Sequence, residues 1–292
     1  MKKKKPVFWK SFLGIIMVFL FLSVTLSGQG KKSEVQQPVL KYHYPSDRQV
    51  SYRETTKVLQ VMDINGQSME NNINTVAGLT LKNVGNSGND SNIEVKIDSL
   101  TQTVDTPAGF SGGPIQDVAG KVFNIILSPS GKEVDNSAAA KITYMTGGGA
   151  AANALQLIEN FFPVLPENTV APGYAWTSND SINSSEPNLV TTGTVKSENS
   201  FSGYELYNGI NCAKFTSSIS GERKMKTQSQ GMDINMSGPY TGTVSSYFST
   251  DDGYFIKQEV STKMTGTIEI TGPQEMSFPL VMEITVIKEV IK

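Results

Sequence analysis

The chain has 292 residues, with 25 Lys and Arg against 27 Asp and Glu, one His and one Cys. Hydrophobic residues make up 38% and there are 26 glycines, an ordinary globular composition that excludes a collagen-like or wholly disordered chain. One cysteine and one histidine exclude an internal disulfide, a Cys-based zinc or iron–sulfur centre and a His-rich metal site, so we expect no metal and no cofactor.

The first thirty residues have the order of a secretory signal peptide. Lysines at 2–5 and 10 are followed by an uncharged apolar run over 12–26 and by the small residues 27–30. An apolar helix of that length rises about 22 Å, less than the roughly 30 Å hydrocarbon core of a bilayer. We predict cleavage near Gly30 and export to the periplasm or the extracellular space. The alternative is an uncleaved anchor over 7–26, through which alone the chain would contact a membrane.

The mature chain is acidic. Removal of residues 1–30 takes away five lysines and no acidic residue, so the formal charge changes from −2 to −7. Arginine occurs only at positions 48, 53 and 223. Such a chain lacks the positive surface of a nucleic-acid binder, and its few arginines argue against phosphate clamps. We predict no nucleic-acid partner.

After a flexible leader over 31–47, the dominant period of the sequence is two. Apolar and polar residues alternate over 73–81, 93–97 and 276–286, as in half-buried antiparallel strands. The pairs Asn65-Gly66, Asn208-Gly209 and Asp252-Gly253 supply the residues that tight hairpins need. We expect a mainly β protein of about ten or eleven strands, built as one large curved antiparallel sheet in the form of an open half-barrel.

One stretch departs from the period of two. Residues 150–162 are rich in helix formers, and Leu155, Ile158 and Phe162 have helical spacing. Glycines precede this stretch and Pro163 follows it. We predict one amphipathic helix here, packed on the concave face of the sheet, with a weaker helical signal over 137–145.

The predicted organisation is a single continuous domain: an N-terminal β half over 48–136, a helical insert over 137–166 and a C-terminal β half over 167–292. At an offset of 122 residues, Tyr52 and Thr55 align with Tyr174 and Thr177, and Gly131 aligns with Gly253. This offset indicates either two pseudo-repeated halves or a coincidence between two β-rich halves.

Candidate chemistry is sparse. Residues 109–114 (GFSGGP) resemble the nucleophile motif of chymotrypsin-like proteases, but Phe110 precedes Ser111 and the only available base is His43, 68 residues away. We interpret this motif as a Gly/Pro loop between strands, His43 as a surface residue and Cys212 as a buried, inert thiol. No carboxylates have metal-ligand spacing, and a catalytic acid pair would need two acids that converge in the fold. We predict a protein that is not an enzyme.

Three segments carry a resemblance to uncharacterised exported bacterial β-proteins: residues 162–177, 128–134 and 204–215. The resemblance implies a shape similar to that of periplasmic outer-membrane lipoprotein carriers, in which an open half-barrel wraps around helices. It implies a fold and a compartment, and it brings no functional residues with it.

Methionine is concentrated late in the chain, with six of the 11 after residue 220. Methionine is flexible and suits surfaces that accept varied apolar partners, although it also fills cores. We predict that the protein binds or carries an apolar small molecule, lipid or lipidated envelope protein. The alternative is a structural or interaction component with a fully packed core, which presents a polar outer face such as 177–200 to a partner. The predicted ligand-binding residues are Met264, Phe278, Met282 and Ile284, with Leu155, Ile158 and Phe162 as a plug.

Overall fold

Long antiparallel strands dominate the structure, as the alternation of apolar and polar residues predicts. The structure is a computed structural model that describes residues 39–64, 66–185, 189–229, 232–272 and 275–291, all within one compact unit. The described residues form fourteen strands and two short 3₁₀ helices. The strands are β1 (Val50–Ile64), β2 (Gln67–Ser87), β3 (Asp90–Thr106), β4 (Gly109–Pro114), β5 (Val122–Leu127), β6 (Glu133–Asp135), β7 (Thr143–Met145), β8 (Ala151–Asn153), β9 (Ala175–Ser185), β10 (Leu189–Tyr207), β11 (Ile210–Ser229), β12 (Met232–Ser249), β13 (Phe255–Thr271) and β14 (Met276–Ile291).

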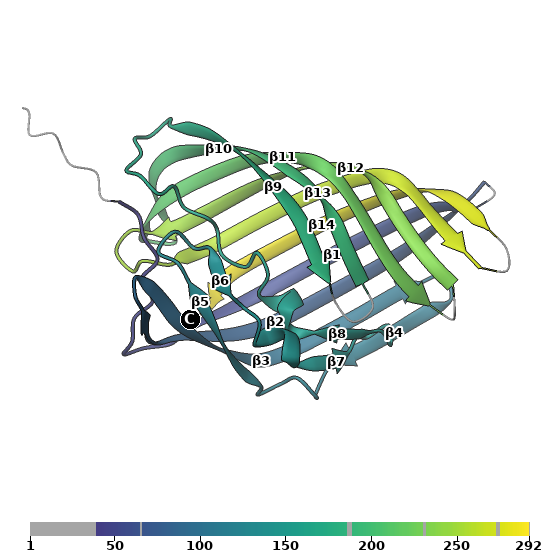
Figure 1. Cartoon of the computed structure of the whole chain (residues 1–292), viewed down its shortest axis with the longest axis horizontal. Coiled ribbons are helices and arrows are strands. Elements are labelled where there is room, and N and C mark those ends of the chain that lie inside the picture. Colours follow the sequence, from purple (N-terminus) through teal and green to yellow (C-terminus); the bar gives the residue numbers. More distant parts are fainter. Residues whose placement is uncertain (1–38, 65, 186–188, 230–231, 273–274, 292) are drawn as a thin grey trace, which may run out of the picture. The chain divides into compact units, whose positions relative to one another are not determined.

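Twelve of these strands form one antiparallel sheet, which is curved and not closed (Figure 1). Its order is β6-β5-β3-β2-β1-β14-β13-β12-β11-β10-β9, with β4 beside β3. The first and last long strands, β1 and β14, therefore pair in the middle of the sheet, and β6 and β9 lie at its edges. Strands β7 and β8 form a separate hairpin. The large curved antiparallel sheet predicted from the sequence is confirmed.

The predicted hairpin turns are present where the structure describes them. Asn208 and Gly209 have φ angles of 50° and 79°, and Gly66 and Gly253 have φ angles of 82° and 76°. These left-handed conformations are the ones that tight hairpins require. Asn65 lies outside the described residues.

The register divides the sheet into an inner, concave face and an outer face, since residues directly opposite each other share a face. On the inner face, Tyr52 lies opposite Leu79, and Met264 lies opposite Met282. All four side chains are buried. On the outer face, Lys263 forms an exposed ion pair with its cross-strand neighbour Glu283. The core of the protein therefore lies within the curve of the sheet.

Five glycines of β10–β13 point to the inner face, and the bend of the sheet depends on them: Gly193, Gly221, Gly238, Gly242 and Gly266. A Cβ on any of them would overlap a carbonyl oxygen of the neighbouring strand. Glycine inside a strand is typical of such close approaches in strongly coiled sheets. These positions allow β10–β13 to curl toward the inner face.

The segment between β6 and β9, residues 136–174, is called the cover segment below. Its residues 150–162 do not form the predicted helix: they contain β8, a 3₁₀ helix over Ala154–Leu157 and an irregular turn. No α-helix occurs in the part of the chain that the structure describes. The helix prediction was wrong because the apolar residues do not form one stripe. Leu157, Ile158, Phe161 and Phe162 are all buried, so the segment is buried on several sides.

The flexible-leader prediction was wrong for residues 39–44, while residues 31–38 lie outside the described residues. Leu40, Tyr42 and Tyr44 are buried in the core, and Lys41 and His43 between them are exposed. This period-two pattern is visible in the sequence, and it is that of an extended segment with one buried face. The exposed position of His43 confirms its prediction as a surface residue.

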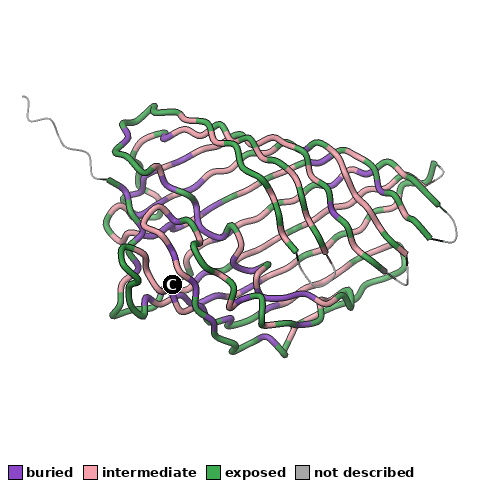
Figure 2. Tube along the Cα trace, viewed as in Figure 1, coloured by how far each residue is buried: buried purple, intermediate pink, exposed green. Residues whose placement is uncertain are grey.

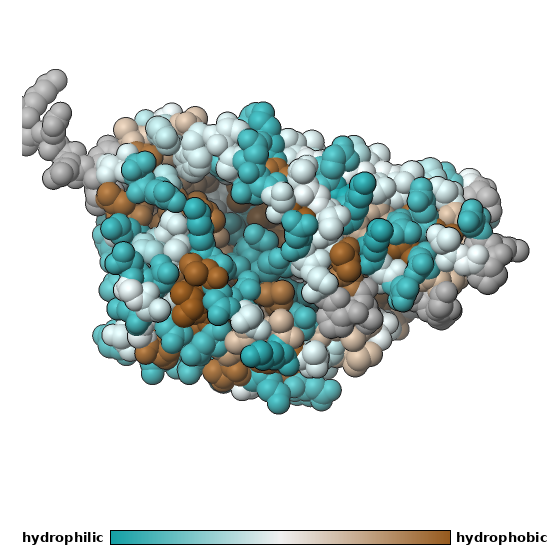
Figure 3. Space-filling view, in the orientation of Figure 1, coloured by the Kyte–Doolittle hydropathy of each residue, from teal (hydrophilic) through white to brown (hydrophobic). Residues whose placement is uncertain are grey.

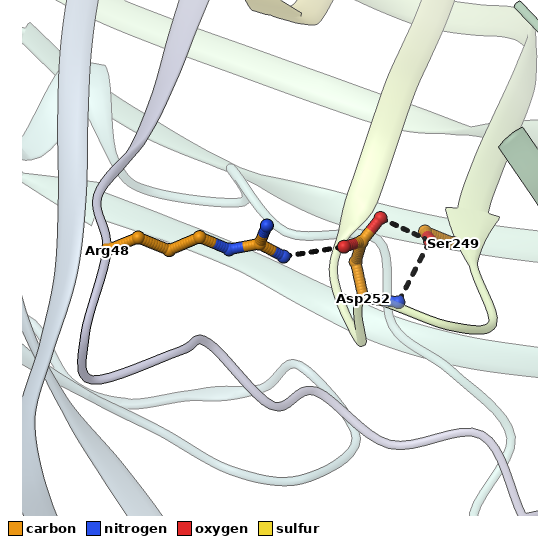
Figure 4. A network of polar contacts seen from close by, with 3 residues as sticks. All are labelled: Arg48, Ser249 and Asp252. Atoms are coloured by element: carbon orange, nitrogen blue, oxygen red, sulfur yellow. Dashed lines mark hydrogen bonds and ion pairs between the residues drawn. The ribbon is translucent and has the colours of Figure 1, made fainter.

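This N-terminal segment is attached to the turn between β12 and β13. The backbone N–H of His43 donates to the carbonyl oxygen of Gly253 at 2.7 Å. Arg48 contacts Asp252 at 2.6 Å, and Asp252 accepts a hydrogen bond from the Ser249 hydroxyl at 2.9 Å (Figure 4). The surface ion pair itself contributes little, so the buried tyrosines supply most of the attachment.

The offset of 122 residues matches the strand boundaries. Shifted by 122, β2 spans 189–209 and β3 spans 212–228, against 189–207 for β10 and 210–229 for β11. The two halves also follow the same order along the sheet, since β3-β2-β1 is matched by β11-β10-β9. This correspondence supports two pseudo-repeated halves arranged head to tail.

Among the described residues, no helix is long and apolar enough to cross a bilayer. The predicted signal peptide and its cleavage position lie outside the described residues and stay predictions.

Replacement of Gly266 by alanine tests the role of the inner glycines. We expect Gly266→Ala to lower the free energy of unfolding by about 2 kcal/mol, because the new methyl group overlaps the Ser237 carbonyl oxygen and the backbone has to shift. Gly148→Ala is the control, since its nearest neighbour is a side-chain atom of Val104 at 3.7 Å. Urea denaturation measures both variants. An unchanged midpoint for Gly266→Ala would contradict the proposed role.

Candidate functional site

The inner face carries two separate clusters of buried apolar residues. The first contains Tyr52, Leu79 and Phe255 and lies under the cover segment. The second contains Met225, Tyr240 and Met264 and lies farther along β10–β14 and β1. Figure 2 shows buried positions gathered toward the end of the sheet that carries β5, β6 and the cover segment.

The predicted ligand-binding residues divide between these two clusters. Ile158 and Phe162 belong to the first cluster, and Leu155 packs against it. Met264 and Met282 belong to the second cluster, at 2% and 4% exposure, and Phe278 and Ile284 pack against it. The structure therefore does not bring the predicted plug onto the predicted methionine-lined surface. The ligand-binding role of these seven residues stays a prediction.

A strip of partly exposed apolar side chains crosses the inner face between the two buried clusters. We call it the inner strip, and its residues are Val58, Ile73, Val244, Val260, Ile284 and Val286. Figure 3 shows this side of the molecule hollowed near its middle, between β9 and the cover segment. The side chains of the inner strip are only partly buried.

A buried lysine holds the cover segment against the sheet. Lys288 of β14 is 6% exposed, and its ammonium group donates to the carbonyl oxygens of Asn160 at 2.8 Å and Phe161 at 3.2 Å. Glu133 of β6 accepts from the backbone N–H groups of Asn160 and Phe161 at 3.1 and 2.9 Å. The positive φ of Asn160, 56°, presents its amide and carbonyl groups to these two partners. Both the N–H groups and the carbonyl groups of this turn therefore have charged hydrogen-bond partners.

Burial shifts the charges around this turn. It lowers the pKa of Lys288, while the nearby carboxylates of Glu54 and Glu133 act to raise it. Burial raises the pKa of both Glu54 and Glu133, and Lys288 opposes that shift. Glu54 lies opposite Lys288 in the register of β1 and β14. The lysine therefore makes both carboxylates less costly to bury, and the two carboxylates do the same for the lysine.

Sequence reasoning missed Lys288, although a signal was present. The apolar alternation over 276–286 continues to Val290, and Lys288 occupies the inner position between Val286 and Val290. A lysine at an apolar parity inside a strand indicates a buried partner. That partner is backbone of a distant segment, which the local sequence does not identify.

The cover segment also contacts strands near both edges of the sheet. The backbone N–H of Gly147 donates to the side-chain oxygen of Gln102 on β3 at 2.9 Å. The Ser184 hydroxyl of edge strand β9 donates to the Glu159 carboxylate at 2.8 Å. The segment therefore links strands near both edges of the sheet and covers the first cluster, whereas the inner strip stays open.

The outer face carries an open groove of about 770 Å³. Most of its lining residues have the outward register, and eight of the fifteen are serines or threonines, including Thr243, Ser245 and Ser261. The two carboxylates among them are Glu198 and Glu259. Ile287 also lines it, so the groove has apolar as well as polar walls.

The protease-like motif of the sequence lies in a strand. The motif at 109–114 is not the predicted loop but the strand β4, which pairs with β3 and places Ser111 opposite Val104. Phe110 before it is 70% exposed. No group of three or more potential metal ligands occurs in the described part of the chain.

Cys212 at the start of β11 is buried, as predicted. Burial raises the pKa of its thiol to about 11, and the carboxylates of Asp252, Glu205 and Asp251 act in the same direction. A thiol with this pKa is protonated at neutral pH and is a poor nucleophile.

Comparisons with known proteins add no function. The sequence matches no protein-family model and no curated protein. A DUF1329 family protein from Desulfovibrio piger is similar to it at 11% identity, over 80% of this chain and 83% of that chain, with a TM-score of 0.15. OccK2 (OpdF) of Pseudomonas aeruginosa, solved in complex with glucuronate, is similar at 7% identity, over 86% of this chain and 100% of that chain, with a TM-score of 0.23. These scores are too low to carry a function to this chain.

Because Lys288 holds the cover segment against the sheet, we expect Lys288→Met to lower the stability of the fold strongly. Removal of the ammonium group leaves two backbone carbonyls and two buried carboxylates without their partner, so we expect a loss of about 3 kcal/mol in unfolding free energy. Lys263→Met on the outer face removes only an exposed ion pair and is expected to cost less than about 1 kcal/mol. Chemical denaturation measures both. Equal losses of unfolding free energy in the two variants would show that Lys288 does not hold the cover segment in place.

The buried thiol predicts slow alkylation. At pH 8 we expect Cys212 in the folded protein to react with a thiol reagent at least about a hundredfold more slowly than in the unfolded chain, because the thiolate is scarce and buried. The folded-state rate should rise with pH toward 11. A folded-state rate equal to that in guanidinium chloride would contradict the burial of this thiol.

Proposed function

We propose that this protein binds the apolar chain of an amphiphile or lipid along the inner strip. The single observation that carries the proposal is the strip itself: six aliphatic side chains on the concave face are only partly buried by the protein's own atoms. Uncovered apolar surface in a concave position is typical of ligand-binding sites. An acyl chain would replace water there.

The surroundings of the strip favour an elongated apolar ligand. At one end the cover segment closes the inner face through Lys288 and Glu133. At the other end the second cluster contains Met225, Met264 and Met282, whose flexible side chains can repack around a ligand. The outer face carries exposed charged and hydroxyl groups, so apolar contact with a ligand is available chiefly inside the curve.

The compartment is part of the proposal. The signal-like residues 1–30 support export, and an exported binder of acyl chains would act on lipids or lipidated proteins of the cell envelope. The alternative, an interaction component of the envelope, is supported by the open groove on the outer face. The two proposals differ in which face carries the contact.

Two neighbouring substitutions on β14 distinguish the inner strip from the outer groove. Val286 belongs to the inner strip and does not line the groove, and Thr285 lies next to it on the outer face and does line it. We expect delipidated wild-type protein to bind a fluorescent naphthylamine probe, Val286→Lys to weaken binding at least about tenfold, and Thr285→Lys to leave it unchanged, since a buried ammonium is costly against an apolar chain.

Circular dichroism and thermal unfolding establish that both variants are folded. Absence of probe binding to the wild type, or equal effects of the two lysines, would overturn the proposal. In that case, capture of an envelope protein that Thr285→Lys abolishes and Val286→Lys preserves would favour the interaction component.

A further inference from the structure

An arginine points into the second apolar cluster. Arg223 of β11 has the same parity as Met225, two residues away, which is buried in that cluster. Its guanidinium lies over the ring of Tyr240, with 4.9 Å from Cζ to the ring centroid. Its Nε atom is buried and has no hydrogen-bond partner. A buried donor without a partner is costly, and more so when it belongs to a charged group.

The positions around this guanidinium lack side chains. Gly193 of β10 and Gly238 of β12 lie directly opposite Arg223, one on each side, and the register continues from Gly238 to Gly266 on β13. Glycines at these positions leave the space beside Arg223 free of side chains. These glycines therefore place no side-chain acceptor or counter-charge beside the arginine, and the backbone of the neighbouring strands comes close there instead.

The neighbouring tyrosine is fixed in place. The Tyr240 hydroxyl donates to the backbone carbonyl of Thr194 at 3.2 Å, across β11 at the position of Gly221. The ring thus lies along the inner face and supports one side of the guanidinium through a cation–π contact. This support orients the guanidinium, and no described group accepts a hydrogen bond from its Nε–H.

No acidic side chain of the described residues forms an ion pair with Arg223 within 4.0 Å. Glu222 beside it has the outward parity. By register, the acidic position on the same face of the neighbouring strands is Asp180, which is exposed on edge strand β9. Within the described residues, no carboxylate therefore neutralises the positive charge among the methionines.

We propose that Arg223 binds the anionic head group, a carboxylate or a phosphate, of the amphiphile whose apolar tail lies on the inner strip. This inference rests on the proposed function and adds the polar end of its ligand. Along β11, Ile219 and Ser217 lie four and six residues from Arg223, which corresponds to roughly 13 and 20 Å. These positions share the register of the inner strip. A single long acyl chain is therefore long enough to extend from Arg223 to the inner strip.

The test compares ligands that differ only in the head group. Isothermal titration of the delipidated full chain with palmitate and with hexadecanol should show that the wild type prefers palmitate by at least about tenfold. Arg223→Gln should lose this preference and keep its affinity for hexadecanol. Arg53→Gln, at an exposed outer position of β1, is the matched control and should keep both affinities. Titration with lysophosphatidate, compared with palmitate, then shows whether the site prefers a phosphate or a carboxylate.

The outcomes separate this inference from the proposed function. If the wild type binds neither palmitate nor hexadecanol, the proposed function fails and the head-group site fails with it. If the wild type binds both equally, or Arg223→Gln keeps the preference, only the head-group site fails. Arg223→Lys retains a charge, so a folded Arg223→Lys variant that keeps part of the preference supports the site even where the glutamine variant does not fold.

Discussion

The pairing of β1 with β14 determines the rest of the architecture. Residues 51–62 of the first strand meet residues 280–291 of the last in unbroken antiparallel register. This pairing joins two runs of consecutive hairpins into one sheet and leaves β6 and β9 at its edges. The chain must then travel from one edge to the other, and residues 136–174 do so across the inner face. The cover of the first cluster is thus a consequence of the strand order.

Curvature determines how much of the inner face this cover leaves exposed. A flat sheet of twelve strands would present a broad apolar surface that one segment of 39 residues could not protect. The inward glycines let β10–β13 curl, so part of the sheet packs its own methionines into the second cluster. The inner strip lies between what the cover segment buries and what the curl buries. The strip is partly exposed because neither the cover segment nor the curl of the sheet buries it fully.

Strand positions were predictable from the sequence because they depend on local alternation. Residues 73–81, 93–97 and 276–286 alternate between apolar and polar positions, and each lies in a strand whose apolar side faces the core. The segment over 150–162 was not predictable in this way. Its apolar residues are buried by distant strands from more than one side, so a helical spacing arises without a helix. The buried tyrosines 42 and 44 were missed for a related reason, since a short alternating run next to a polar leader has no neighbours in sequence that reveal its partners.

The two inward cations show which part of a site a sequence can indicate. Lys288 and Arg223 both occupy apolar parities, so each position alone indicates a charge that needs a partner. Lys288 finds its partners in the carbonyl groups of Asn160 and Phe161 and in nearby carboxylates, and it holds the cover segment in place. Arg223 has a tyrosine ring beside it, glycines on both sides and a buried Nε–H without an acceptor. The same electrostatic requirement is met by the chain in the first case. In the second, the described residues supply no acceptor for the Nε–H group, so the proposed binding surface depends on the arginine and not on the methionines alone.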